Sequence, residues 1–515
     1  MIRRIATSLL FALIALAGSA PSAAAAASSP ATMASATSGV WYEIFVRAWY
    51  DTDGDGIGDL NGVTAKLDYL QSLGVSGIWL MPINPSPSYH GYDVTDYDAI
   101  NPQYGTMADF DRLLREAHRR GIKVIIDLVV NHTSDRHPWF LAARDPKDPH
   151  HAWYSWAGPD TDLHAASATG GQAWHALGGQ HYLGIFTGEM PDLDFDTPAV
   201  RAAVTDAGRR WLARGVDGFR LDAARHVYAD FPEQVDDPAI LQRNLAWWSS
   251  FHAAMTKARP GAYLVGEVTR DDPRQLAPWY GSLDAVFDFP LAAQLIRSAG
   301  SERNHGLDDL LGRIAASIPA GRDAPFLSNH DQERVMSQLD GNPQHMRLAA
   351  AMLLTLPGQP FVYYGEELGM RGRKPDPDLR EPMRWHRDPR GTGESRWKDF
   401  SAGDGPAVSV DAEQDDARSM LAWYRMLIGW RRALPVLRDG ALRVPAVDNR
   451  HLAAWELTDA GHDVLVVHNL SHQPQTLELA GPLARFNRVR LASQPDASIA
   501  DGRLHLSAYA SVVLQ

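Results

Sequence analysis

The chain has 515 residues, of which 45% are hydrophobic and 22% charged, so it can form several domains and bury a large core. Its formal net charge is -13 and no basic patch stands out, which argues against nucleic acid as the main partner and fits a neutral substrate. The absence of cysteine excludes disulfides, a cysteine nucleophile and thiolate metal sites.

The first segment has the features of an export signal. Arg3 and Arg4 precede a short apolar stretch over residues 9–17, and small residues at 24–26 offer a cleavage position. We therefore expect a signal peptide over residues 1–26, a disordered linker over 27–38, and a periplasmic or secreted protein. The stretch is too short to span a bilayer comfortably, so no stable membrane anchor is expected; a retained anchor is the alternative.

From residue 39 onward, short apolar runs alternate with longer amphipathic stretches. The apolar runs cover residues 41–46, 76–81, 123–130, 218–222, 263–268, 285–289, 325–328 and 361–364. Helical patterns cover residues 63–73, 108–120, 199–214, 241–257 and 346–356. Buried parallel strands are continuous apolar runs, so this alternation predicts an α/β fold, a (β/α)8 TIM barrel. An open doubly wound sheet is the alternative, but its Gly-rich turn does not follow the first run.

Two inserts interrupt the barrel pattern, which then ends. Residues 132–196 are rich in Trp, Gly, His and Asp and lack a helical rhythm, which predicts an inserted domain after the third strand. The barrel is therefore expected in two parts, 39–131 and 197–436, with a polar insert at about 371–416. Alternating apolar residues and recurrent turns over 437–515 predict a C-terminal antiparallel β-sandwich domain.

Three carboxylates stand at the ends of separate apolar runs: Asp222, Glu267 and Asp331. Acids at consecutive strand ends predict an active site at the carboxyl face of a barrel, and paired carboxylates favour sugar chemistry. Arg220 lies two residues before Asp222, so both side chains point to the same side of a strand. We expect the guanidinium to lower the pKa of the Asp222 carboxyl.

The segments around these acids, with residues 127–132, resemble the four core signatures of the α-amylase superfamily (glycoside hydrolase family 13), in the same order. Three lesser signatures resemble residues 77–82, 190–195 and 358–367, and the resemblance covers nearly everything from about residue 40. It implies that Asp222 is the nucleophile, that Glu267 is the general acid/base with a raised pKa, and that Asp331 binds ring hydroxyls of the distorted sugar. It also implies that Asp127 supports Arg220 from within the barrel.

The resemblance implies further substrate-binding residues at eight positions: Tyr92, Asp93, His132, Arg220, Arg225, His226, His330 and Arg380. His132 and His330 would bond the sugar at the cleavage point, and Tyr92 would stack on it. Asp93 would hold hydroxyls and pair with Arg380. Arg225 and His226 would contact the leaving side. A capped structural histidine and a solvated loop arginine are the alternatives at these positions.

Residues 51–59 predict a calcium site. Asp51, Asp53, Asp55 and Asp59 occupy positions 1, 3, 5 and 9 of a loop similar to an EF-hand, and Ile57 at position 7 would ligate through its carbonyl. The loop departs from that pattern because position 12 is a glycine and a strand, not a helix, precedes it. A similar loop in the family subgroup that cleaves short α-glucosides implies one structural calcium; a solvated acidic turn is the alternative.

The residue after the nucleophile indicates the type of bond. Ala223 is small, as in family members that act on α-1,4 links, whereas α-1,6-acting members tend to carry valine. We therefore expect a retaining α-amylase, acting as a monomer on starch and maltodextrins. A maltodextrin glucosidase or cyclodextrinase-type enzyme with transglycosylation, and a catalytically silent glycan-binding barrel, are the alternatives.

Overall fold

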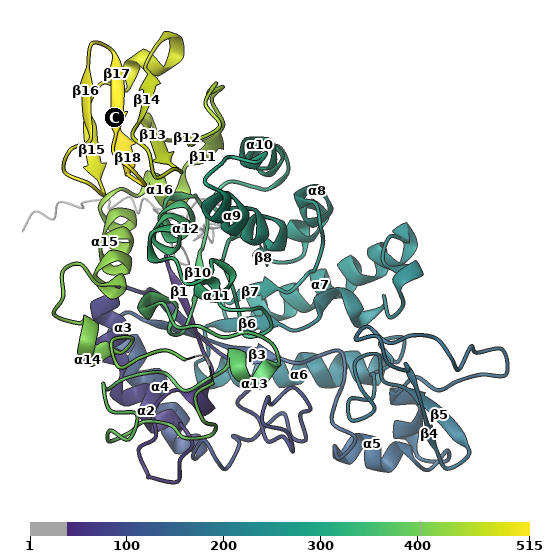
Figure 1. Ribbon diagram of the computed structural model, residues 1–515. Helices are drawn as coiled ribbons and strands as arrows, with labels where there is room; N and C mark the ends of the chain where they lie inside the picture. Colours follow the sequence, from purple (N-terminus) through teal and green to yellow (C-terminus); the bar gives the residue numbers. More distant parts are fainter. Residues whose placement is uncertain (1–38, 402) are drawn as a thin grey trace, which may run out of the picture.

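The computed structural model describes residues 39–401 and 403–515 (Figure 1). The expected signal peptide and linker lie outside the described residues. Eight parallel strands form the centre, in the order β10-β1-β2-β3-β6-β7-β8-β9. They are β1 (Trp41–Ile44), β2 (Gly77–Leu80), β3 (Lys123–Leu128), β6 (Gly218–Leu221), β7 (Tyr263–Gly266), β8 (Ala285–Phe287), β9 (Asp323–Ala324) and β10 (Phe361–Tyr363).

The sheet closes on itself through the segment after β9. Phe326 forms a parallel bridge with Phe361, whose backbone N–H donates to the carbonyl of Pro325 at 2.9 Å. The predicted (β/α)8 TIM barrel is therefore confirmed. The seventh strand is displaced, however, to Asp323–Ala324 from the expected residues 325–328. Pro325 has no N–H to give to a neighbouring strand, so regular pairing stops in front of it.

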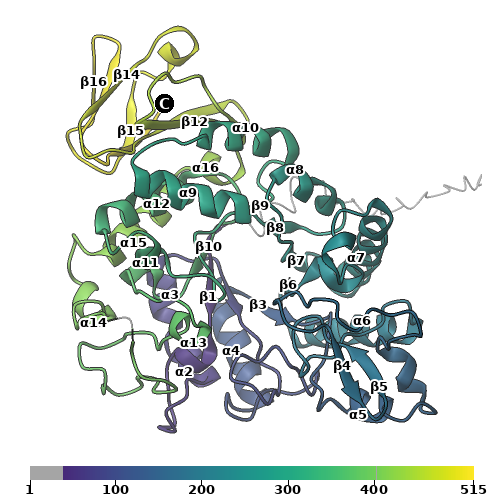
Figure 2. The ribbon, with the colours of Figure 1, turned by 45° about the vertical axis from the view of Figure 1, so that its right-hand side comes forward.

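Helices cover the outside of the barrel (Figure 2). The main ones are α2 (Leu60–Ala65), α3 (Leu67–Leu73), α4 (Met107–Arg119), α6 (Pro198–Arg214), α7 (Pro238–Ala258), α9 (Phe289–Ser301), α10 (Leu307–Ser317), α12 (Pro343–Thr355) and α15 (Met420–Ala433). The helix expected over residues 63–73 is two helices that meet at Lys66. Among all helices of the described residues, none combines the length and the apolar character that a membrane span needs.

Aromatic side chains fill the barrel interior below the strand ends. Trp41 stacks on Tyr263 at 5.1 Å and on Phe361 at 5.8 Å between ring centroids, and Trp79 and Phe287 belong to the same buried cluster. A barrel filled in this way is a packed core and not a pore. The polar residues Glu43, Asp127 and Arg220 lie in the carboxyl-terminal halves of their strands.

The insert after β3 and the C-terminal domain lie at opposite ends of the molecule (Figures 1 and 2). The segment between β3 and α6 carries α5 (Pro138–Ala143) and the hairpin of β4 (Trp174–Leu177) and β5 (Gln180–Leu183). The C-terminal part has a five-stranded sheet, β11-β12-β13-β18-β15, and a three-stranded sheet, β14-β17-β16, with antiparallel pairing throughout. These strands are β11 (Ala441–Arg443), β12 (Leu452–Asp459), β13 (His462–Asn469), β14 (Gln475–Glu478), β15 (Val489–Ala492), β16 (Ser498–Ala500), β17 (Arg503–Leu506) and β18 (Ser511–Leu514).

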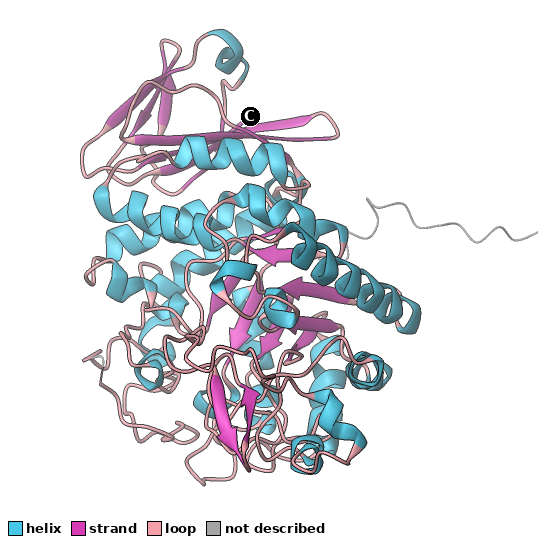
Figure 3. Cartoon of the chain, turned by 90° about the vertical axis from the view of Figure 1, so that its right-hand side faces the viewer, coloured by secondary structure: helices cyan, strands magenta, loops and turns pink. Residues whose placement is uncertain are grey.

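The larger C-terminal sheet is buried on both of its faces. Leu465 and Val467 of β13 pack into the core between the two sheets, whereas Val464 and Val466 belong to the main core cluster that includes the barrel helices. The alternation seen in the sequence thus separates two buried environments and not a core from solvent. The cartoon in Figure 3 shows this domain at the top of the molecule, resting on helices.

Candidate active site

Three carboxylates share one buried guanidinium at the carboxyl ends of β3, β6 and β7. Nη1 of Arg220 lies 2.9 Å from Oδ1 of Asp127 and 2.5 Å from Oδ1 of Asp222, and Nη2 lies 2.9 Å from Oε2 of Glu267. Arg220 and Asp222 do point to the same side, and Asp127 does support Arg220, as expected. Parallel strands end at the same edge, so acids one residue past β6 and β7 are brought together.

The residue after Asp222 helps to fix the second acid. Ala223 adopts a left-handed backbone with φ of 45°, and its N–H donates to Oε2 of Glu267 at 2.9 Å. A small, unbranched side chain costs less in this conformation than a β-branched or bulky one. The turn therefore couples the orientation of Glu267 directly to the strand that carries Asp222.

Burial dominates the protonation of Asp222. It raises the pKa of this carboxyl to about 8, although Arg220 acts to lower it, and the charge of Glu267 adds to the rise. Arg220 therefore acts on the Asp222 pKa in the expected direction, but burial and the neighbouring acids outweigh it, so the net pKa is raised. One guanidinium faces three carboxylates here, so the group retains a proton near neutral pH.

Asp331 lies beside this cluster and has two cationic partners. Its Oδ2 is 3.0 Å from Nε2 of His330, and its Oδ1 accepts from Nη2 of Arg380 at 3.0 Å. Arg380 also donates from Nε to the carbonyl of His330 at 3.0 Å. The pairing expected between Arg380 and Asp93 is therefore wrong: the guanidinium binds the third acid instead.

Asp93 is held by hydroxyl groups on its own loop. Its Oδ1 accepts from Ser86 at 2.5 Å and also from Ser88, and the residue is only 3% exposed. Tyr92, next to it, donates its hydroxyl to Asp127 at 3.1 Å and stacks on the His330 ring at 5.4 Å. The structure thus brings Tyr92 into the carboxylate cluster.

Two buried histidines have unused hydrogen-bonding capacity. Within the described residues, both ring nitrogens of His132 and Nδ1 of His226 lack a hydrogen-bond partner. Burial lowers the pKa of both rings to about 3. Buried polar groups are nearly always paired, so these neutral rings indicate a place where a ligand supplies the partner. Arg225, in the same turn, is half-buried, and burial lowers its pKa.

Sequence reasoning missed Phe186, which lies between these histidines. It comes from the inserted segment, and its ring centroid is 5.3 Å from that of His132 and 5.3 Å from that of His226. No signal distinguishes it from the other aromatic residues of the insert, because the contact depends on how the insert folds over the barrel.

Glu43 of β1 was missed as well: its Oε1 lies 2.6 Å from Nδ1 of His330. A lone acid inside an apolar run was a usable signal for it.

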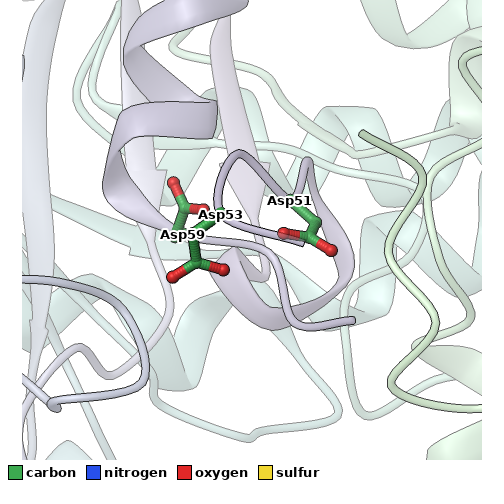
Figure 4. Close-up of side chains that lie close together, drawn as sticks. All are labelled: Asp51, Asp53 and Asp59. Carbon is green, nitrogen blue, oxygen red and sulfur yellow. The ribbon is translucent and has the colours of Figure 1, made fainter. Parts of the chain in front are cut away.

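The predicted calcium loop follows β1 and leads into α2 (Figure 4). Carboxylate oxygens of Asp51, Asp53 and Asp59 all lie within 4.8 Å of one another. Backbone N–H groups hold two of these acids: Gly54 of the loop donates to Asp51 at 2.6 Å, and Gly62 in the first turn of α2 donates to Asp59 at 2.7 Å.

The fourth predicted aspartate, Asp55, lies outside this group. The carboxylate of Asp55 is exposed, and its Oδ1 accepts a hydrogen bond from the backbone N–H of Ile57 at 2.7 Å. Hard oxygen donors on a tight loop fit Ca²⁺ chemically, and three of the four predicted aspartates meet in one place. The structure therefore supplies a smaller acidic set than the sequence predicted.

The closed barrel, with carboxylates on a shared guanidinium at its strand ends, is the fold and site of a glycoside hydrolase. Residues 43–440 match the family model described as "Alpha amylase, catalytic domain", and residues 452–513 match "Alpha-amylase SusG C-terminal domain". The chain therefore belongs to the alpha-amylase family, and it is an enzyme of the glycoside hydrolase class.

Three relatives illustrate its place in the family. It is 37% identical to "Alpha-amylase 3" of Dictyoglomus thermophilum over 92% of this chain and 93% of that one. It is 32% identical to "Trehalose synthase/amylase TreS" of Mycobacterium tuberculosis, over 85% and 82% of the two chains. The crystal structure of alpha-amylase from H.orenii superposes with a TM-score of 0.85 and 41% identity, covering 93% of this chain and 99% of that one.

Proposed function

We propose that this enzyme is an α-amylase that hydrolyses α-1,4-glucosidic bonds in starch and maltodextrins with retention of configuration. The observation that carries the proposal is the placement of Asp222 and Glu267 on one guanidinium at adjacent strand ends. Relatives named as amylases support the choice of substrate. Export to the periplasm or beyond, and action as a monomer, remain part of the proposal.

In the proposed reaction, Asp222 attacks the anomeric carbon and Glu267 protonates the leaving oxygen. A glycosyl ester on Asp222 results, and water that Glu267 deprotonates then releases the sugar with retained configuration. Asp331, held by His330 and Arg380, binds ring hydroxyls and favours the oxocarbenium-like transition state. The carboxylates around Arg220 retain a proton near neutral pH. The reaction requires this proton to be on Glu267 when the glycosidic bond breaks, so that Asp222 is ionised and can attack.

The product pattern tests the proposal. The purified protein is incubated with maltoheptaose, soluble starch and pullulan, products are followed over time, and proton NMR identifies the first-formed anomer. Mixed maltooligosaccharides with the α-anomer first are expected, and Asp222→Asn and Glu267→Gln should each reduce turnover by at least about 10³-fold. Unchanged hydrolysis in either variant would refute the assigned roles. No hydrolysis by the unaltered protein would favour the glycan-binding alternative.

A transglycosylating glucosidase is the second candidate, and Phe186 is the observation that favours it. An aromatic ring between His132 and His226 narrows the region beside the acids. Exclusion of water there would favour transfer to a second sugar. Release of glucose alone from the start, or formation of trehalose or longer products from maltose, would select this candidate.

We also propose that calcium binds at Asp51, Asp53 and Asp59. Their convergence supports it, and the ion would supply charge neutralisation that stabilises the loop between β1 and α2. Isothermal titration of the chelator-treated protein with calcium tests the proposal. No binding heat and no change in Tm would overturn it.

A further inference from the structure

Strand β1 contains a buried carboxylate that the proposed reaction does not use. Glu43 is 2% exposed, and its strand neighbours in register are Trp79 and Tyr363. A carboxylate in such surroundings costs free energy unless it is paired. Its Oε1 lies 2.6 Å from Nδ1 of His330, a residue that is 1% exposed and 287 positions away in the chain. The pairing with His330 therefore explains how a carboxylate is accommodated at this buried position.

The other nitrogen of the same ring faces the catalytic cluster. Nε2 of His330 lies 2.7 Å from the Tyr92 hydroxyl and 3.0 Å from Oδ2 of Asp331. The single hydroxyl proton of Tyr92 is directed to Asp127, at 3.1 Å, and an ionised carboxylate can only accept. Nε2 must therefore carry a proton. An ionised Glu43 can likewise only accept, so Nδ1 donates to its Oε1 and both ring nitrogens serve as donors.

We propose that Glu43 is a positioning residue that fixes the His330 ring and keeps it doubly protonated, so that His330 holds Asp331 ionised against the sugar. This rests on the proposed function, in which Asp331 contacts the substrate. Glu43 itself does not reach the substrate and acts only through His330.

The charges around the pair agree with this role. Burial alone would lower the pKa of His330, but the charges of Asp331 and Glu43 outweigh it and raise this pKa to about 9. Burial raises the pKa of Glu43, and the charge of His330 opposes that rise. The other titratable or charged groups that face the pair come from five neighbouring segments: Tyr92, Asp127, Arg220, Tyr363, Glu366 and Arg380.

The test uses Glu43→Gln, which retains an acceptor of the same shape but no charge. The expected result is a loss of at least about 10-fold in kcat on maltoheptaose at pH 8, a smaller loss at pH 6, and an alkaline limb moved by about one pH unit to lower pH. In a His330→Gln background, Glu43→Gln should cause no further loss, because the two residues act as one unit. Additive losses, or an unchanged pH profile, would overturn the proposal.

A matched control is available in the same buried region. Glu367 is fully buried and accepts the hydroxyls of Tyr42 and Tyr69, each at 2.6 Å. Glu367→Gln removes a buried charge of similar kind without contact to His330. It should alter Tm but leave the pH profile unchanged. If Glu367→Gln moves the alkaline limb as far as Glu43→Gln does, the effect is general and the proposal fails.

A second readout does not depend on turnover or on the folding of any variant at position 43. In protein labelled with ¹⁵N-histidine, NMR reports the protonation of the His330 ring, whose signal is identified by its loss in His330→Gln. The ring should remain an imidazolium up to about pH 9. A neutral ring at pH 7 would overturn the proposal. If the protein does not cleave maltoheptaose at all, the proposed function fails, but this titration still decides the role of Glu43.

Discussion

At the scale of single residues, the site is a set of acids whose charges are balanced by few cations. Arg220 serves Asp127, Asp222 and Glu267, while Asp331 has His330 and Arg380. The pKa of Asp331 is accordingly held well below its usual range, chiefly by His330 acting against burial. Asp222 has only a share of one guanidinium, and its pKa rises. The difference between the pKa values of these acids follows from their partners and from their exposure, because the side chain of Asp331 is 45% exposed and that of Asp222 only 10%.

The rate should fall as the pH rises past about 8. Below that pH the Asp222 carboxyl keeps a proton within the carboxylate cluster, where the leaving oxygen needs one; above that pH this proton is lost. The measurement is kcat/KM on maltoheptaose from pH 5 to pH 10, with Tm recorded in the same buffers. A rate that stays constant to pH 10 while the fold is intact would contradict this assignment.

Phe186→Ala should weaken substrate binding with little effect on folding. The ring is half-buried and contacts His132 and His226, so its loss removes an apolar wall at the site and not core packing. We expect KM for maltotriose to rise roughly 5- to 30-fold, the equivalent of about 1–2 kcal/mol. Leu141→Ala, at a 47% exposed position on α5, is the control. Equal KM values for the two variants would show that Phe186 does not face the substrate.

At the scale of elements, the loop after β1 is linked to the third acid. The N–H of Asp51 donates to the carbonyl of Gly393 at 2.9 Å, and Arg396 donates to the carbonyl of Gly56 at 2.7 Å. From the same segment, Nε1 of Trp397 donates to the carbonyl of Arg380 at 3.0 Å, and Arg380 binds Asp331. The polar insert at 371–416 thus connects the acidic loop to the active site.

Removal of calcium should therefore lower both stability and turnover. Without the ion, repulsion between three aspartates loosens the loop, and the insert that carries Arg380 loses its support. Asp51→Asn should reproduce the effect of a chelator, a fall of several degrees in Tm and a lower kcat, and calcium should restore only the unaltered protein. Asp55→Asn, outside the acidic group, is the matched control. An unchanged Tm after chelation would contradict the prediction.

At the scale of the whole molecule, Glu302 joins the barrel to the C-terminal domain. It follows α9 and accepts hydrogen bonds from Tyr509 at 2.5 Å, from His472 at 2.5 Å and from His345 of α12 at 3.2 Å. Its own carbonyl accepts from His451 at 2.8 Å. Burial would raise the pKa of Glu302, but these donors outweigh it and lower the pKa to about 2.

Glu302→Gln should destabilise the protein at neutral pH by on the order of 1–3 kcal/mol, because the ionised carboxylate is favoured only in the folded state. A lowered pKa contributes stability that is complete above the unfolded value of 4.5 and is lost as pH falls toward about 2. The Tm difference from the unaltered protein should thus shrink below pH 4.5. Glu478→Gln, at an exposed position of β14, serves as control. A difference that does not vary with pH would exclude ionisation as the cause.

The sequence by itself determined the barrel, the order of its elements and the three acids. Parallel strands buried on both faces must be continuous apolar runs, and acids that follow such runs must meet at one edge, so local patterns were sufficient. The Arg220 and Asp222 pair was predictable for the same reason, since residues two apart on a strand share a side. The seventh strand was misplaced because an apolar run does not show which backbone groups pair, and Pro325 prevents the pairing there.

Tertiary structure alone decided which partner each polar group has. Arg380 binds Asp331 and not Asp93, Phe186 meets His132 and His226, and Glu43 meets His330, all across segments distant in the chain. The pKa of Asp222 depends on how deeply the carboxyl is buried and on how many acids share Arg220. Both depend on segments from many parts of the chain, so no local pattern shows them. Sequence patterns specify where a side chain leaves the backbone; the packing of distant segments specifies what it meets, and the chemistry of the site depends on both.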